Sequence, residues 1–228
     1  MIEINQAIEE IENQIEEALR SLEMRDDIER ALEKYLEAET ALSALDVTVE
    51  NPAYPEYQRV LSYCLLRQGN ILRQMGKPAE AFALGEREIT AARLSDNEIG
   101  LARSLLSNGT NHIISGGTGK GLALLEEART LFESGDRYDH QQGLGWYWIL
   151  QADLTNAGMI EREPAEVIEM AARILEILKP IENWPGVARA YAARAKAHES
   201  VGNGEAAAGD RKKQQYYESL IGPEEDSG

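Results

Sequence analysis

The sequence contains a single cysteine, Cys64, so no disulfide bond can form within the chain. Aromatic residues are also scarce at 6%, and the apolar content of 43% consists largely of Ala, Leu and Ile. Such small and aliphatic side chains are typical of closely packed helices rather than of β-sheets. No apolar run approaches the roughly eighteen residues that a membrane helix needs. The first residues, MIEINQAIEEIE, lack the positive and apolar regions of a signal peptide, so we expect a cytoplasmic protein.

Basic residues are outnumbered, because 23 Lys and Arg stand against 40 Asp and Glu and give a net charge of −17. Residues 1–50 contain fifteen acidic and four basic residues and carry −11 of this charge. A polyphosphate backbone or an anionic membrane surface would be repelled, which excludes nucleic acid and membranes as partners. The excess negative charge serves either solubility or the attraction of a basic protein segment.

An internal repeat runs through the chain with a period of 41 residues. Gly76, Gly117 and Gly158 are 41 residues apart, and a further step of 44 residues reaches Gly202. Each glycine stands where one helical pattern ends and another begins, so we expect a turn glycine with positive φ at each position. Three columns of aliphatic, small or aromatic residues keep the same register, at spacings that share one helical face. These columns are Leu65, Leu106, Tyr147 and Tyr191; Leu72, Ile113, Leu154 and His198; and Leu61, Ala102, Gly143 and Val187.

The first fifty residues add an earlier unit, ERALEKYLEAETAL, in which Ala31, Tyr35 and Ala38 are spaced four and three apart. This segment resembles the second helix of a tetratricopeptide repeat (TPR), and PAEAF at 78–82 resembles the turn and second-helix start of the same family. The resemblance implies an all-α fold, a right-handed superhelical array of about five antiparallel helix pairs. A HEAT-like array has a closer period and is the alternative. The turn glycines and the Ala-Tyr-Ala spacing favour the TPR-like α-solenoid.

We therefore expect one helical repeat domain over residues 1–221 and a disordered acidic tail at 222–228. NPAYPEY at 51–57 is the one long connection expected, because its two prolines oppose a continuous helix. The expected repeats are 2–45, 57–94, 97–134, 139–179 and 184–220. The expected helices are 2–24, 27–45, 57–75, 78–94, 97–115, 119–134, 139–157, 163–179, 184–201 and 204–220.

Motifs of catalysis are absent from this pattern. SGGTGKG at 115–121 resembles a phosphate-binding loop, but Ile114 and Gly121 occupy the places where that motif needs Gly and Ser or Thr. His112, His140 and His198 share no metal-ligand spacing with each other or with Cys64. No nucleophile and base can be paired. We predict no enzyme activity, no cofactor and no metal site.

An apolar stripe runs along the first helix at steps of four and three. It can either cap the first repeat or form a homodimer through the N-terminal helix, and both interpretations stay open. The stripe consists of Ile4, Ile8, Ile11, Ile15, Ala18 and Leu22.

Two asparagines form the candidate binding site. Asn70 and Asn111 are 41 residues apart, each six residues before its turn glycine, and asparagine is mildly unfavourable within a helix. In peptide-binding TPR domains, similar asparagines on the concave face bond the main chain of an extended ligand. Leu66 and Ser107 replace the lysine of chaperone-tail binders, so we do not expect a clamp for EEVD-type tails. By register the same face carries Tyr63, Leu66, Arg73, Ser107, Trp148, Arg189 and Lys196.

These features predict a non-enzymatic scaffold that binds another protein or a peptide in the concave groove of a TPR superhelix. Two alternatives remain. One is a ligand-sensing regulatory module that acts in trans, since the chain shows no DNA-binding or ATPase segment. The other is a self-associating structural subunit.

Overall fold

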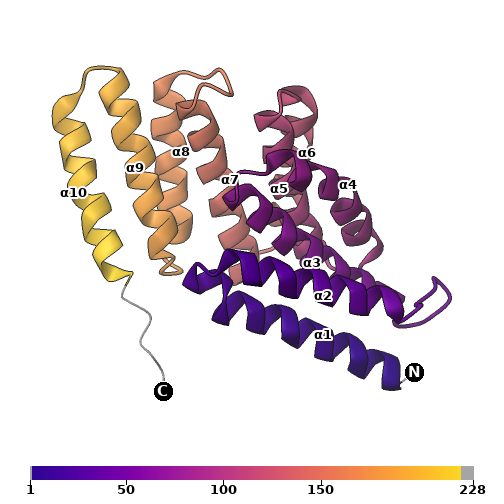
Figure 1. Ribbon diagram of the computed structural model, residues 1–228. Coiled ribbons are helices and arrows are strands. Elements are labelled where there is room, and N and C mark those ends of the chain that lie inside the picture. Colours follow the sequence, from indigo (N-terminus) through magenta and orange to yellow (C-terminus); the bar gives the residue numbers. More distant parts are fainter. Residues whose placement is uncertain (1, 222–228) are drawn as a thin grey trace. The chain divides into compact units, whose positions relative to one another are not determined.

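The computed structural model describes residues 2–221, and this part of the chain is entirely helical, with no β-strand (Figure 1). Each predicted helix is present, and a 3-10 turn at Glu23–Arg25 replaces the predicted end of the first helix. The predicted tail at 222–228 lies outside the described residues. None of the described helices is both long enough and apolar enough to cross a membrane. The helices are α1 (Ile2–Ser21), α2 (Ile28–Ala44), α3 (Tyr54–Gln74), α4 (Pro78–Leu94), α5 (Glu98–Ile114), α6 (Thr118–Glu133), α7 (Tyr138–Asn156), α8 (Pro164–Leu178), α9 (Trp184–Ser200) and α10 (Gly204–Leu220).

The chain divides into two compact units, unit 1 at Met1–Leu124 and unit 2 at Leu125–Gly228, with the boundary inside α6. Within each unit, helices that follow one another in the chain pack together, as in α3 with α4 and α9 with α10. The prediction of a single domain over 1–221 stays a prediction.

The core of unit 1 begins with the apolar stripe of α1. Ile8, Ile11 and Ile15 are buried in one cluster with Tyr35 and Leu42 of α2. Burial of such side chains contributes about 1.5–3 kcal/mol each, so the stripe stabilises the first pair of helices. Four of the six stripe residues are therefore buried inside the unit, Ile4 and Leu22 are partly buried, and the homodimer stays a prediction.

The core of unit 2 lies between α7, α8 and α9, where Ile149, Ile174 and Leu178 are almost fully buried. The last pair is joined by a charged contact as well. Arg194 of α9 donates two hydrogen bonds, of 2.8 and 2.7 Å, to the carboxylate of Asp210 of α10. Asp210 is 4% exposed, so this bidentate pair fixes α10 against α9 from the inside.

The first helix of each of four pairs ends at a glycine with positive φ. Gly76, Gly158 and Gly202 have φ of 72°, 72° and 74°, which confirms three of the four predicted turn glycines. The prediction for Gly117 is wrong, because the positive φ of 86° belongs to Gly116. Gly116 donates to the Ile113 carbonyl and Gly117 to the His112 carbonyl, at 3.0 and 2.7 Å. This is a Schellman C-cap, and it begins one residue earlier than the glycine spacing indicates.

The predicted connection at 51–57 is too long. Helix α3 begins at Tyr54 and takes Pro55 into its first turn. A proline fits there because the first N–H groups of a helix have no partner within it. The Asn51 side chain accepts a hydrogen bond of 2.9 Å from the Ala53 N–H just before the helix begins.

The turn at Gly202 allows a matched test of the backbone. Gly202 and Gly209 both have open space around an added Cβ, but only Gly202 has positive φ. Gly202→Ala should lower the free energy of unfolding by about 1–2 kcal/mol, because an L side chain disfavours the left-handed region. Gly209→Ala, within α10, should raise it by about 0.5–1 kcal/mol because glycine weakens a helix interior. Urea denaturation followed by circular dichroism measures both, and shifts of the same sign would contradict the turn assignment.

Candidate binding site

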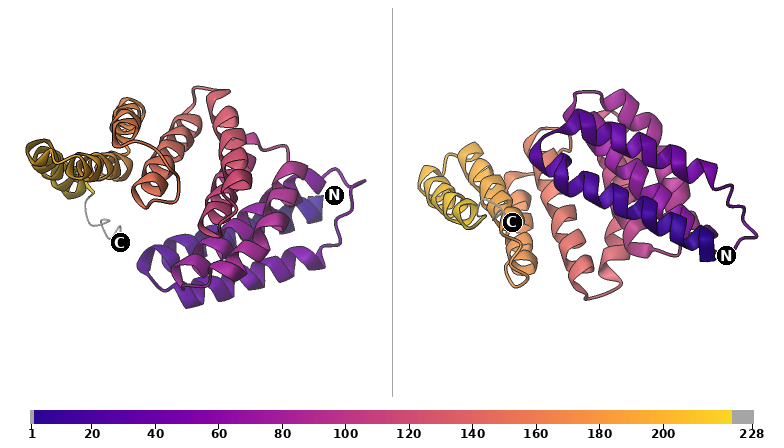
Figure 2. Two further views of the ribbon diagram at one scale, coloured as in Figure 1. Left: turned by 90° about the horizontal axis from the view of Figure 1, so that it is seen from above. Right: turned by 60° about the horizontal axis from the view of Figure 1, so that its bottom comes forward.

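A small pocket opens where α1, α3 and α5 meet in unit 1; Figure 2 shows these helices from two further sides. Its volume is about 180 Å³. Two of the predicted groove residues, Tyr63 and Leu66, line it, so the first helices of successive pairs do share a face. The complete lining is Glu12, Glu16, Arg59, Ser62, Tyr63, Leu66, Asn97, Gly100, Arg103 and Ser104.

Charges in this pocket are largely matched within the protein. Arg59 donates 2.7 Å from its Nη1 to Glu12 of α1 and 2.8 Å from its Nε to Glu56. Burial raises the pKa of the Tyr63 hydroxyl, and a hydrogen bond to Glu16 raises it further. The pocket floor is therefore polar but contains no unmatched charge at Arg59 or Tyr63.

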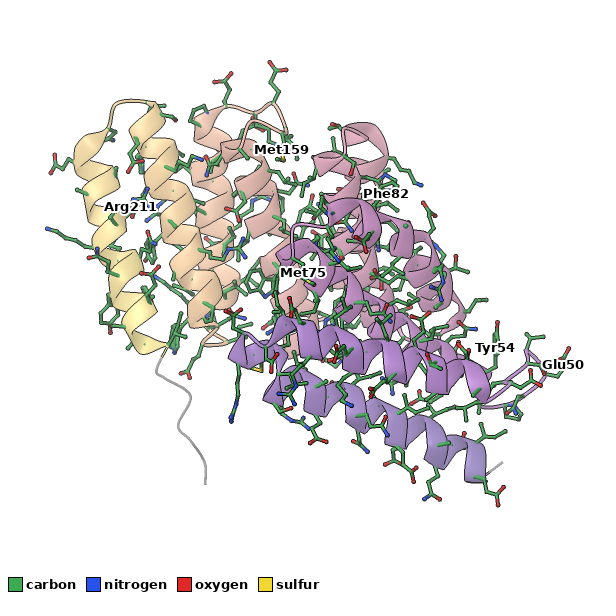
Figure 3. The ribbon with its side chains drawn as sticks, viewed as in Figure 1. Glu50, Tyr54, Met75, Phe82, Met159 and Arg211 are labelled. Carbon is green, nitrogen blue, oxygen red and sulfur yellow. The ribbon has the colours of Figure 1, made fainter. Side chains whose placement is uncertain are left out.

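Arg73 of α3 is not among the residues that line this pocket, and its guanidinium lies between two amides rather than beside an acid. Its Nη1 donates 3.1 Å to the Asn111 Oδ1 of α5, and its Nη2 donates to the Asn70 Oδ1 one turn earlier on α3. Among the described residues, no carboxylate forms an ion pair with Arg73. Burial lowers the pKa of the guanidinium, while the charge of Glu88 acts in the opposite direction. Figure 3 labels Met75, the C-cap of α3, two residues beyond Arg73.

Glu88 of α4 is the acid whose charge acts on Arg73. It is only 2% exposed, and its Oε2 accepts 3.0 Å from the Asn108 Nδ2 of α5. Its Oε1 is buried without a hydrogen-bond partner in the described part of the chain. Burial raises the pKa of Glu88 to about 7, although the neighbouring Ser104 and Asn108 and the charge of Arg73 act to lower it. A buried acid of this kind changes its charge near neutral pH.

Close approach of α4 and α5 brings Asn108 to Glu88. A Cβ built on Gly85, one turn before Glu88, would lie 1.8 Å from the Asn108 Oδ1. Only glycine leaves room for the amide there. The sequence alone does not mark Glu88 as buried, because REITAARL has the pattern of an ordinary solvated helix. Gly85, one turn earlier, is the only local sign of close helix packing there.

The predicted residues of unit 1 therefore come together in part. Asn70, Arg73 and Asn111 form one hydrogen-bonded group, although Asn111 is only 6% exposed. Ser107 is half-buried, and its Oγ has no partner among the residues that the structure describes. The 41-residue spacing therefore points to two residues of this hydrogen-bonded group. The structure adds that the Asn70 and Asn111 side-chain oxygens both accept hydrogen bonds from Arg73.

The predicted residues of unit 2 do not form a comparable group. Trp148 is half-buried on α7. The guanidinium carbon of Arg173 of α8 lies over the Trp148 ring, 4.9 Å from the ring centre. Arg189 is paired with Asp153 and lies 5.1 Å from the Trp146 ring centre. Lys196 is exposed on α9.

Other sequence features have structural roles. His198 lies 3.9 Å from Asp210, beside the Arg194 pair, and His112 packs edge-on to Phe82 with ring centres 4.8 Å apart. The glycines of SGGTGKG form the α5–α6 turn and the start of α6, without a preceding strand. In the described part of the chain, no three His, Cys, Asp or Glu side chains are grouped to hold a metal.

A larger pocket of about 430 Å³ lies between α1 and α2. Its cations are already matched, because Arg30 pairs with Asp27 and Lys34 with Glu37. The group around Arg73 is therefore the stronger candidate.

Comparison with known proteins identifies the fold. A crystal structure of BtubC (BKLC) from P. vanneervenii has a TM-score of 0.65 at 12% identity, over 99% of this chain and 96% of that chain. A putative kinesin light chain from Podosopora anserina with nearly identical TPR-like repeats has a TM-score of 0.62 at 15% identity, over 94% and 97% of the two chains. A singly substituted variant of that protein has a TM-score of 0.56 at 16% identity, with the same coverage. The chain has a TPR-like repeat fold.

The TPR-like fold confirms the predicted α-solenoid and favours it over the HEAT-like alternative. No protein-family model matches the sequence, and no curated protein matches it. At identities of 12 to 16%, the likeness concerns the TPR-like architecture alone.

Glu88 should make stability depend on pH. Its pKa is raised by burial from 4.5 to about 7, so the unfolded chain loses this proton first as the pH rises. Stability from this group is complete below about pH 4.5 and is lost by about pH 7, on the order of 3 kcal/mol in total. The stability of Glu88→Gln relative to the native protein should therefore rise by about 2–3 kcal/mol from pH 5 to pH 8.

Glu86→Gln is the matched control for this measurement. Glu86 is exposed on the same helix, and its hydrogen bond with Lys120 lowers its pKa, so it stays ionised above pH 5. Urea unfolding at both pH values measures the three proteins. If Glu88→Gln and Glu86→Gln gained the same stability relative to the native protein from pH 5 to pH 8, the Glu88 carboxyl would not be the cause of the pH dependence.

Proposed function

We propose that the chain is a non-enzymatic, cytoplasmic scaffold that binds an extended segment of another protein on the face of α1, α3 and α5. Arg73 is the anchor for an acidic group of that segment. One observation carries this proposal, namely a half-buried guanidinium held by two neutral amides and paired with no carboxylate of the described residues. The TPR-like fold supports the general role of a repeat scaffold.

The energetic argument concerns the surroundings of Arg73. A guanidinium has five N–H donors, and two hydrogen bonds to amide oxygens leave further donors for a ligand. Partial burial has already removed water from the group, so an incoming carboxylate regains charge-assisted hydrogen bonds at little further cost of desolvation. Such bonds contribute about 1.5–3 kcal/mol each.

Asn70 and Asn111 act on the ligand through Arg73 in this proposal. Their side-chain oxygens accept from the two guanidinium nitrogens and so fix the plane of the group. A planar donor that is already oriented loses less conformational entropy on binding. Direct bonding of the ligand main chain by the asparagines, as first predicted, is secondary, because Asn111 is buried.

A peptide array tests the anchor. The array pairs extended hexapeptides that differ only in a central Glu or Gln, so that a preference for Glu reports the acidic group. Arg73→Gln should abolish this preference and weaken Glu-peptide binding by about 1.5–3 kcal/mol. The double variant Asn70→Ala, Asn111→Ala should weaken it by about 1 kcal/mol while leaving the helices intact, since alanine is the better helix former.

Arg30→Gln is the control, because it also removes one positive charge. Arg30 is an exposed residue of α2 that is paired with Asp27. Arg30→Gln should leave the preference unchanged. Arg73 is not the anchor if the native protein shows no preference for Glu over Gln. The same conclusion follows if Arg30→Gln lowers this preference as much as Arg73→Gln does.

A further inference from the structure

Glu88 is a buried titratable group that the proposed binding face does not itself use. It is 2% exposed, it accepts one hydrogen bond of 3.0 Å from Asn108, and its second oxygen is unpartnered among the described residues. An unpaired buried oxygen is costly when the carboxylate is charged and much less so when it carries a proton. The site therefore tolerates both forms of this acid near neutral pH.

Helix α5 connects Glu88 with the proposed anchor. Asn108 holds the Glu88 carboxylate, and Asn111, three residues later, accepts from the Arg73 Nη1 at 3.1 Å. Both amides lie in the buried part of the same helix. Asn108, which contacts Glu88, is therefore within one helical turn of Asn111, which orients Arg73, so a change in the charge of Glu88 can affect that contact.

Electrostatics connects the two groups as well. The charge of Arg73 lowers the pKa of Glu88, and the charge of Glu88 raises the pKa of Arg73. They attract each other through the interior without forming an ion pair. Because Glu88 is buried and Arg73 is half-buried, this attraction is screened less than one between two surface charges.

We propose that an acidic ligand group at Arg73 and the ionised form of Glu88 compete for the same guanidinium, so that the site binds an acidic segment with uptake of a proton by Glu88. This inference rests on the proposed function. It specifies the ligand as a carboxylate-bearing segment, and it makes binding stronger as the pH falls through neutrality.

The charged groups around Glu88 support this assignment. Arg73 is the charged side chain that acts on it from α3, and Ser104 and Asn108 of α5 are neutral neighbours. On its own helix, Glu86 is exposed and engages Lys120, and Arg87 pairs with Glu39 of α2. Burial lowers the pKa of the His112 imidazole of α5, which lies 3.8 Å from Glu86, so His112 is the second titratable group to control for.

The direction of the pH effect on affinity follows from the coupling between proton binding at Glu88 and ligand binding at Arg73. At pH 6 most of the protein has a neutral Glu88, and Arg73 is fully available to the ligand; at pH 8 most has a charged Glu88 that attracts Arg73 inward. Affinity should therefore be higher at pH 6, by roughly fivefold, a typical coupling between two sites. Reciprocally, a bound carboxylate should raise the pKa of Glu88.

The probe is the peptide acetyl-Gly-Glu-Gly-amide, titrated into the full chain and followed by NMR shifts of the Asn70, Asn111 and Arg73 side chains at pH 6 and pH 8. The native protein should bind roughly fivefold more tightly at pH 6. Glu88→Gln should bind with one affinity at both pH values, close to the native value at pH 6. His112→Gln should keep the native difference.

A ligand-free measurement accompanies this titration, in case Glu88→Gln folds poorly. The carboxyl carbon resonance of Glu88 gives its pKa directly, and Arg73→Gln should raise this pKa because it removes the attracting charge. An unchanged pKa would overturn the coupling. Equal native affinity at pH 6 and pH 8 would also overturn the coupling while leaving the anchor in place, and absence of peptide binding at both pH values would overturn both.

Discussion

In four of the five helix pairs, the reversal of the chain depends on a backbone position that only glycine adopts easily. Gly76, Gly116, Gly158 and Gly202 each have positive φ and each donates to a carbonyl in the last turn of the preceding helix. The residue after each glycine donates to the carbonyl five residues before its own position, so the same two hydrogen bonds close α3, α5, α7 and α9. This shared geometry returns the chain antiparallel, and the pairing of neighbouring helices follows from it.

A second constraint is the matching of buried charge. Most charged groups in the interior have a close opposite partner, as in Arg194 with Asp210 and Arg67 with Glu23. Arg73 and Glu88 do not, because each is held by neutral amides instead. Charges that are fully or partly buried without an opposite partner reduce stability, and in unit 1 the two groups held in this way lie within one turn of each other's amide partners on α5.

Much of the fold could be predicted because apolar side chains recur at helical spacing and turn glycines recur at one period. The register also found Asn70 and Asn111, which lie in equivalent places on α3 and α5. Two features escaped it. Counting from glycine to glycine cannot show whether Gly116 or Gly117 takes the left-handed conformation, since both are glycines. Glu88 escaped because its burial depends on the contact between Gly85 and Asn108, and such a long-range contact leaves no local pattern.

Packing between helices that are neighbours in the chain has a kinetic consequence. Within unit 1, α3 contacts α4 and α4 contacts α5, so most of the core joins segments only a few tens of residues apart. Closing such short loops loses little chain entropy, and proteins of low contact order fold in microseconds to milliseconds. Each pair can form beside a completed neighbour, as in other linear repeats. The chain therefore needs no distant segment before its first helices acquire a partner, and assembly can begin during synthesis.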